Sequence, residues 1–163
     1  MAPTLTKPAK ATRRFDSPQQ EAYLALWRTY DRLRMLEDEL FARFDLTAQQ
    51  YNALRLLRAE HPEPLPTLVL AERLVSRAPD ITRLVDKLEE RGLITRTRPP
   101  ENRRSVLVAI AEAGISLIDE IASPLRACHA KQLGHVPAAD LVKLIALLKA
   151  ARAPHETDES VWR

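Results

Sequence analysis

The chain has 163 residues, of which 45% are hydrophobic and 29% charged, and its formal net charge is +3. This length suits a single domain with a buried core, and the composition is ordinary for a soluble globular protein. No run of about 18 apolar residues is present, which excludes a membrane-spanning helix. Cys128 is the only cysteine, so an internal disulfide is excluded, and we expect a protein of the reducing cytoplasm.

The N-terminal segment combines Lys7, Lys10, Arg13 and Arg14 with prolines and alanines. It contains no apolar stretch of the kind found in a secretory signal. We expect residues 1–16 to form a disordered basic arm. An equally simple interpretation is a solvated tail without a role.

Two helices are predicted at the start of the folded part. Over residues 17–44, leucines and aromatic residues recur at steps of three and four, which is the period of an amphipathic helix. A second helix is predicted over residues 48–60, because Thr47 and Gln50 have the spacing of a capping box. With only three glycines in the whole chain, the composition favours helices throughout.

The middle of the chain alternates helices with breaks. Residues 61–66 contain three prolines and are predicted to form a rigid linker. A short helix is predicted over residues 67–74, followed by a turn at 75–78. In the next helix we expect Pro79 at the first helical position, with Asp80 beside it to suit the helix dipole.

The helix that begins at Pro79 is predicted to end at Gly92 and to lead into a basic hairpin over residues 93–110. Nine basic and five acidic residues lie between positions 73 and 104, an excess of four positive charges in a chain whose total is +3. The charge is therefore concentrated here, as the neutralisation of nucleic-acid phosphates requires.

The order of these elements predicts a mainly α (α+β) fold: a winged helix-turn-helix with a two-stranded wing, flanked by long N- and C-terminal helices. Two helices, over about 112–134 and 137–153, follow the hairpin. We expect residues 17–153 to form a single domain and residues 154–163 a polar tail.

Individual residues suit contacts with duplex DNA. Arg77 and Arg83, near the start of the helix before the hairpin, can each bind guanine or phosphate with two hydrogen bonds. Thr82 can contact a thymine methyl or a phosphate. At the hairpin tip Arg104 can enter a narrow minor groove, with Asn102 holding its guanidinium extended. The candidate DNA-binding residues are Arg77, Asp80, Thr82, Arg83, Lys87, Arg96, Arg98, Asn102, Arg103 and Arg104.

The alternative interpretation is a solvated surface held by internal ion pairs. In that case Asp86 and Glu90 pair with Lys87 and Arg91 on the same helix.

The chain resembles the MarR family of bacterial transcriptional regulators. The matching words are LAERL at 70–74, DITRLVDKLEERGLITR at 80–96, NRRSVLVAI at 102–110 and EAG at 112–114. The resemblance implies a regulator, expected to be a repressor, that binds a palindromic DNA operator as a homodimer.

The resemblance also divides the expected domain. It implies a DNA-binding lobe over about 46–110, and dimerisation helices over 17–44 and 112–153. Two copies related by a two-fold axis would read half-sites about one helical turn apart.

The chain departs from the family pattern at three positions. Asn102 and Pro99 stand where acidic residues are usual, so the grip of the wing on DNA is expected to be looser or more cationic. Ala111 replaces the usual threonine cap of the following helix, which costs about 1 kcal/mol of local stability.

Relatives of this kind commonly bind small aromatic or phenolic anions, which implies a ligand-responsive regulator. The candidate pocket residues are Trp27, Tyr30, Arg34, Tyr51 and Leu54. Aromatic residues at helical spacing also serve as core, which is the alternative for this set.

Redox sensing and metal binding are two other ways in which the regulator could be controlled. Some relatives sense peroxides through a cysteine near the first helix, and Cys128 is the candidate for a redox-responsive regulator. Its position among leucines instead favours an inert, buried thiol. His129 and His135 have no carboxylate cluster close in sequence, so no metal site is expected.

Enzyme motifs are missing from the sequence. It has no Gly-rich phosphate loop, no nucleophile elbow, no HExxH and no CxxC. We therefore expect a protein that is not an enzyme and needs no cofactor. A dimeric protein- or RNA-binding module remains as an alternative, and it would show no preference for a palindromic duplex.

Overall fold

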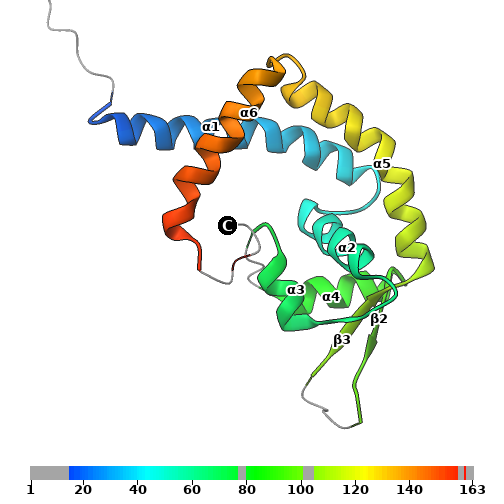
Figure 1. Cartoon of the computed structure of the whole chain (residues 1–163). Coiled ribbons are helices and arrows are strands. Elements are labelled where there is room, and N and C mark those ends of the chain that lie inside the picture. The colour runs from blue at the N-terminus through cyan, green and yellow to red at the C-terminus, as the bar shows by residue number, and fades with distance from the viewer. Residues whose placement is uncertain (1–14, 77–79, 101–104, 158–159, 161–163) are drawn as a thin grey trace, which may run out of the picture. The chain divides into compact units, whose positions relative to one another are not determined.

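The computed structural model describes residues 15–76, 80–100, 105–157 and 160 (Figure 1). The chain divides into two compact units, residues 1–35 and 36–163, and each is described by itself. No helix in the described ranges is long and apolar enough to cross a membrane. The predicted basic arm lies almost entirely outside the described residues, as does part of the polar tail.

The predicted fold class is confirmed, because the described chain is mainly helical with one small antiparallel sheet. The helices are α1 (Pro18–Ala42), α2 (Ala48–Glu60), α3 (Thr67–Arg73), α4 (Ile81–Glu90), α5 (Glu112–Leu133) and α6 (Ala138–Arg152), followed by the 3₁₀ turn η1 (Ala153–His155). The strands are β1 (Leu65–Pro66), β2 (Ile94–Thr97) and β3 (Leu107–Ile110).

The N-terminal unit is the first part of α1. The Ser17 hydroxyl accepts from the backbone N–H of Gln20 at 3.1 Å and caps the helix. Tyr23, Trp27 and Tyr30 are exposed on this helix, and the rings of Tyr23 and Trp27 lie 6.2 Å apart in a tilted arrangement.

In the second unit, the end of α1 turns sharply into α2. Asp45 adopts a left-handed conformation (φ 53°), and the backbone N–H of Leu46 reaches back to the Phe41 carbonyl at 3.0 Å. Thr47 then caps α2, and Gln50 completes the predicted capping box in both directions. The bounds predicted for α2 are confirmed.

The prediction of a rigid linker over residues 61–66 is wrong for its last two residues. Leu65 and Pro66 form β1, which pairs antiparallel with Val108 and Leu107 of β3. The strand order is β1-β3-β2, so β1 is an edge strand. A proline is tolerated there because an edge residue does not need to donate a ladder hydrogen bond. The sheet therefore has one strand more than the predicted two-stranded wing.

The core of the second unit lies between α2, α4, α5 and the sheet. Its largest fully buried side chains are Leu54, Leu57, Leu70, Leu88, Ile94, Ile121, Val85 and Val108. Gly114 brings α5 against the hairpin, since a Cβ there would overlap the Leu93 carbonyl and lie 2.8 Å from Ile110 Cγ1. As expected, Ala111 gives α5 no side-chain cap.

Candidate nucleic-acid interface

The start of α4 differs from the prediction. The helix begins at Ile81, and Asp80 is its N-cap rather than a residue of the first turn. The Asp80 carboxylate accepts from the backbone N–H of Arg83 at 2.9 Å. A short acidic side chain satisfies an otherwise unpaired N–H better from the cap position, which explains the shift. Pro79 lies outside the described residues.

The end of α4 is a Schellman motif. Gly92 has φ +67°, its N–H donates to the Glu89 carbonyl at 2.8 Å, and the N–H of Leu93 donates to the Leu88 carbonyl at 3.0 Å. The glycine stop is confirmed. It sends the chain from α4 directly into β2, which places the hairpin beside this helix (Figure 1).

Helix α4 is strongly amphipathic. Leu84, Val85 and Leu88 are buried in the core. The opposite side exposes Thr82, Arg83 and Lys87 to solvent. Three of the candidate DNA-binding side chains therefore share one helix and lie away from its packed face.

The helix-turn-helix turn is held by two polar side chains of α2 that the sequence analysis missed. The Asn52 side-chain oxygen accepts from the backbone N–H of Val75 at 3.0 Å. The Gln49 amide donates to the Ser76 hydroxyl at 3.3 Å. No local signal identifies these residues, because their partners lie more than 20 positions further along the chain.

Arg96 and Arg98, in and just after the first strand of the hairpin, have different surroundings. Arg98 follows β2 and is exposed, and it has no ion pair with a described residue. Arg96 lies within β2 opposite Val108, and its side chain is only 28% exposed. Its guanidinium binds the carboxylates of Asp86 and Glu89 on α4.

The Arg96 ion pairs shift the pKa values of both Glu89 and Arg96. The hydrogen bond from Arg96 lowers the pKa of Glu89 below its ordinary value. Hydrogen bonds to Glu89 and then Asp86 raise the pKa of Arg96, against the effect of its desolvation. The alternative interpretation of the sequence, in which Asp86 pairs with a cation on its own helix, is therefore wrong in its choice of partner.

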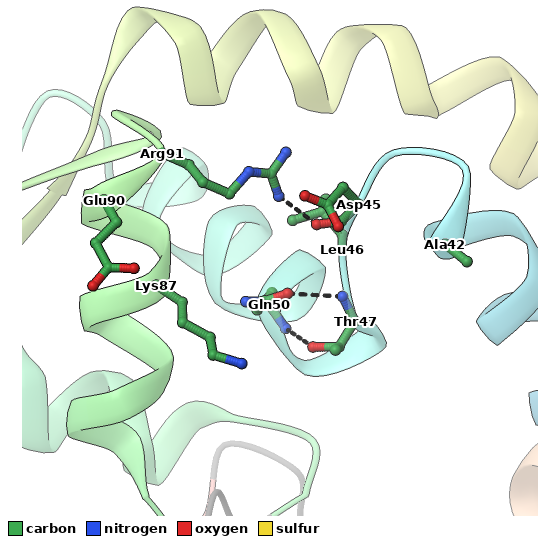
Figure 2. Close-up of a pocket in the computed structure, with 8 residues that line it drawn as sticks. All are labelled: Ala42, Asp45, Leu46, Thr47, Gln50, Lys87, Glu90 and Arg91. Atoms are coloured by element: carbon green, nitrogen blue, oxygen red, sulfur yellow. Dashed lines mark hydrogen bonds between the residues drawn. The ribbon is translucent and has the colours of Figure 1, made fainter.

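Arg91 binds backbone carbonyls, and not a carboxylate of its own helix as the solvated-surface interpretation expected. Its guanidinium donates to the backbone carbonyls of Asp45 at 2.5 Å and Phe44 at 3.2 Å. This joins the end of α4 to the turn between α1 and α2. Figure 2 shows Arg91 extending toward Asp45, beside a pocket of about 440 Å³. The pocket is lined by Ala42, Asp45, Leu46, Thr47, Gln50, Lys87, Glu90 and Arg91.

Four candidate DNA-binding residues, Arg77, Asn102, Arg103 and Arg104, lie outside the described residues. The described candidates fall on α4 and β2 or just beyond them.

The candidate effector residues belong to two different units. Trp27 and Tyr30 are each 61% exposed on α1, and Arg34 is exposed further along the same helix. In the second unit, Tyr51 stacks on Phe41 with ring centroids 4.7 Å apart, and burial raises its pKa.

Leu54 of the same set is fully buried in the core. Core packing is therefore sufficient to explain why Tyr51 and Leu54 occupy these positions on α2, without a role in binding an effector.

Cys128 is half-buried on α5. Burial, and secondarily the nearby Glu37 carboxylate, raise the pKa of its thiol. A raised pKa reduces the thiolate fraction and with it the reactivity toward peroxides. The adjacent His129 lies 3.4 Å from Glu37, measured between Nε2 and Oε1.

Comparison with known proteins identifies the family. Residues 46–106 match the MarR family. A MarR transcription factor from Planctomyces limnophilus, known from its crystal structure, is 57% identical in sequence. The match covers 84% of this chain and 99% of that protein's chain, with a TM-score of 0.68. The chain therefore belongs to the MarR family of transcription regulators, as its sequence motifs indicated.

Two further relatives illustrate the range of this similarity. The organic hydroperoxide resistance transcriptional regulator of Bacillus subtilis (strain 168) is 38% identical over 78 residues, a match that spans 48% of this chain and 52% of the relative. CouR from Rhodococcus jostii RHA1, solved bound to p-coumaroyl-CoA, is 25% identical, with a TM-score of 0.70 and coverage of 88% and 100%.

Proposed function

We propose that the protein is a ligand-responsive transcriptional repressor that binds a palindromic DNA operator as a homodimer. Helix α4 would enter the major groove, and the hairpin of β2 and β3 would reach the minor groove. Such a regulator would act where chromosomal DNA lies, in the cytoplasm.

The observation that carries this proposal is the exposed side of α4. Thr82, Arg83 and Lys87 extend into solvent from a helix whose other side is locked into the core. The N-cap at Asp80 and the Schellman motif at Gly92 fix both ends of the helix. A rigid helix with a polar, cationic outer side is what major-groove reading requires.

The hairpin adds a second cationic element beside this helix. Arg98 is exposed just beyond β2, and the sequence places Arg103 and Arg104 a few residues further along. Phosphate contacts from such residues position a protein on the duplex, while the helix reads base edges.

The dimer is supported by apolar surface that the single chain leaves open. No residue of α6 is buried, and four of its large apolar side chains are 37–68% exposed: Val142, Leu144, Ile145 and Leu147. The N-terminal unit likewise exposes a set of large apolar residues, namely Tyr23, Leu26, Trp27, Tyr30 and Met35. Several large exposed apolar side chains on one element are typical of a protein interface.

The effector is proposed to be a small aromatic or phenolic compound. The support is the ligand of CouR, p-coumaroyl-CoA, which carries a phenolic group. Of the aromatic residues in the candidate pocket set, Trp27 and Tyr30 are exposed in the single chain. A ligand acts by favouring a spacing of the two recognition helices that does not fit the operator.

The test is selection of bound duplexes from a random DNA pool, followed by titration of the selected duplex with p-coumaroyl-CoA and simple phenolic acids. We expect an inverted repeat whose half-sites lie about one helical turn apart. Recovery of no common sequence, or a monomer in sedimentation at micromolar concentration, would contradict the proposal. RNA binding without duplex preference would favour the alternative binding module.

A further inference from the structure

We propose that Arg96 is a positioning residue for DNA binding, and that it ties the recognition helix to the wing instead of contacting DNA. The inference rests on the proposed function and assigns a role within it. It replaces the sequence-based expectation that Arg96 itself binds DNA.

The geometry leaves Arg96 little capacity for another partner. Nε donates to Glu89 Oε2 at 2.7 Å, and Nη1 donates to Asp86 Oδ1 at 2.6 Å. Nη2 also donates to Glu89 Oε2. All three nitrogens of the guanidinium are thus engaged by two carboxylates of α4, and the side chain is mostly covered.

These contacts add a polar link between α4 and the hairpin, beside the buried packing of Leu88 against the same core as Ile94. Asp86 and Glu89 lie three residues apart on α4, so the guanidinium spans almost one helical turn. Arg96 itself is held in β2 by pairing with Val108 of β3. The fork therefore adds to the core packing in holding the rotation of α4 about its own axis relative to the hairpin, because arginine donates in a rigid planar array.

The same contacts offset part of the negative charge of the two carboxylates, since the single guanidinium supplies one positive charge. Two unpaired negative charges on a helix in the major groove would repel the phosphates on either side. Bound to Arg96, they are drawn toward the hairpin, while Arg83 and Lys87 remain exposed. The pKa of Glu89 is lowered by the hydrogen bond from Arg96, so this carboxylate stays ionised and paired at neutral pH.

Asp86→Asn separates this role from simple electrostatics. By charge alone, removal of an acidic group from a DNA-binding helix tightens binding. As part of a positioning fork, its loss weakens binding, by roughly 5- to 100-fold if one base contact is misaligned. Glu90→Gln is the matched control, because Glu90 is an exposed acid of the same helix outside the fork. We expect Glu90→Gln to bind as well as wild type or better.

Arg96→Lys and Arg98→Gln complete the set. A lysine keeps the charge that a phosphate contact needs but cannot bridge two carboxylates, so we expect Arg96→Lys to lose affinity like Asp86→Asn. Its salt dependence should keep the wild-type slope. Arg98→Gln should flatten the slope of log K against log salt by about one unit if Arg98 neutralises one phosphate.

The measurement is fluorescence anisotropy with the duplex selected by wild type, at four salt concentrations, with thermal unfolding of each variant to confirm folding. Tighter binding by Asp86→Asn, or wild-type affinity for Arg96→Lys, would overturn the inference while leaving the proposed function intact. A wild-type protein that selects no duplex would instead remove the proposed function and this inference with it.

Discussion

Gly114→Ala tests how closely α5 approaches the hairpin. Glycine occupies a buried position at the start of α5, where an added Cβ would overlap the Leu93 carbonyl oxygen and lie 2.8 Å from Ile110 Cγ1. That carbonyl already accepts from the backbone N–H of Ala111 at 3.0 Å. The methyl group therefore has to displace backbone, and not only the flexible end of a side chain.

The expected magnitude follows from three contributions. Overpacking of a tight core costs about 1–3 kcal/mol. Weakening the hydrogen bond between Ala111 and Leu93 costs about 1 kcal/mol more. Alanine recovers about 0.5–1 kcal/mol over glycine through its helix propensity. We expect a net loss of about 1–3 kcal/mol in the free energy of unfolding, and a fall in Tm of about 3–10 °C.

The assay is urea unfolding followed by circular dichroism, at one fixed protein concentration because the stability of the proposed dimer would depend on concentration. Ala113→Gly, at an exposed position of the same turn, measures the propensity contribution separately. If Gly114→Ala is as stable as wild type, the close approach of α5 to the hairpin does not constrain the fold, and this reasoning is wrong.

Four further predictions follow from individual contacts. Arg91→Ala should lower the free energy of unfolding by about 1–3 kcal/mol, since two backbone carbonyls lose a charged donor. The urea midpoint measures this loss, and an unchanged midpoint would mean that the turn at Asp45 does not need the Arg91 hydrogen bonds. Arg83→Ala should cost about 1–3 kcal/mol in binding to the selected duplex if it reads a base, whereas equal losses on selected and random DNA would make it a phosphate contact. Because the folded-state pKa of Glu89 is lowered, its pairing with Arg96 stabilises the fold above the ordinary glutamate pKa and loses this effect as pH falls through the lowered value. The Tm difference between wild type and Glu89→Gln should accordingly shrink between pH 7 and pH 3, and a constant difference would rule out this linkage. Cys128→Ser should leave any response of DNA binding to peroxide unchanged, because burial raises the thiol pKa; loss of a response that wild type shows would make the cysteine the sensor.

Much of the fold was predictable because its signals are local. The capping box of Thr47 and Gln50, the glycine stop at Gly92 and the uncapped start of α5 at Ala111 each depend on residues within one turn. Helical periodicity likewise located the long helices to within about two residues. The same locality explains why Leu65 and Pro66 were missed as a strand: their partners lie about 40 positions away in β3.

The site was predictable in its residue types and only partly in their roles. Thr82, Arg83 and Lys87 share the exposed side of α4, as helical spacing alone requires. Arg96 has the same charge and lies in the same motif, yet it is engaged by Asp86 and Glu89. Alternation along a strand indicates which side a residue occupies but not which side chains of a neighbouring helix lie there.

The sequence by itself determined the family, the order of the helices and the hairpin, and the concentration of positive charge around α4 and the hairpin. Only the tertiary structure decided which of those charges are available: Arg91 is taken up by the carbonyls of Phe44 and Asp45, Arg96 by the carboxylates of α4, and Arg98 remains exposed. The physical reason is that a charged side chain pairs with whatever lies within a few ångströms. For these residues that is set by packing between elements and not by spacing along the chain.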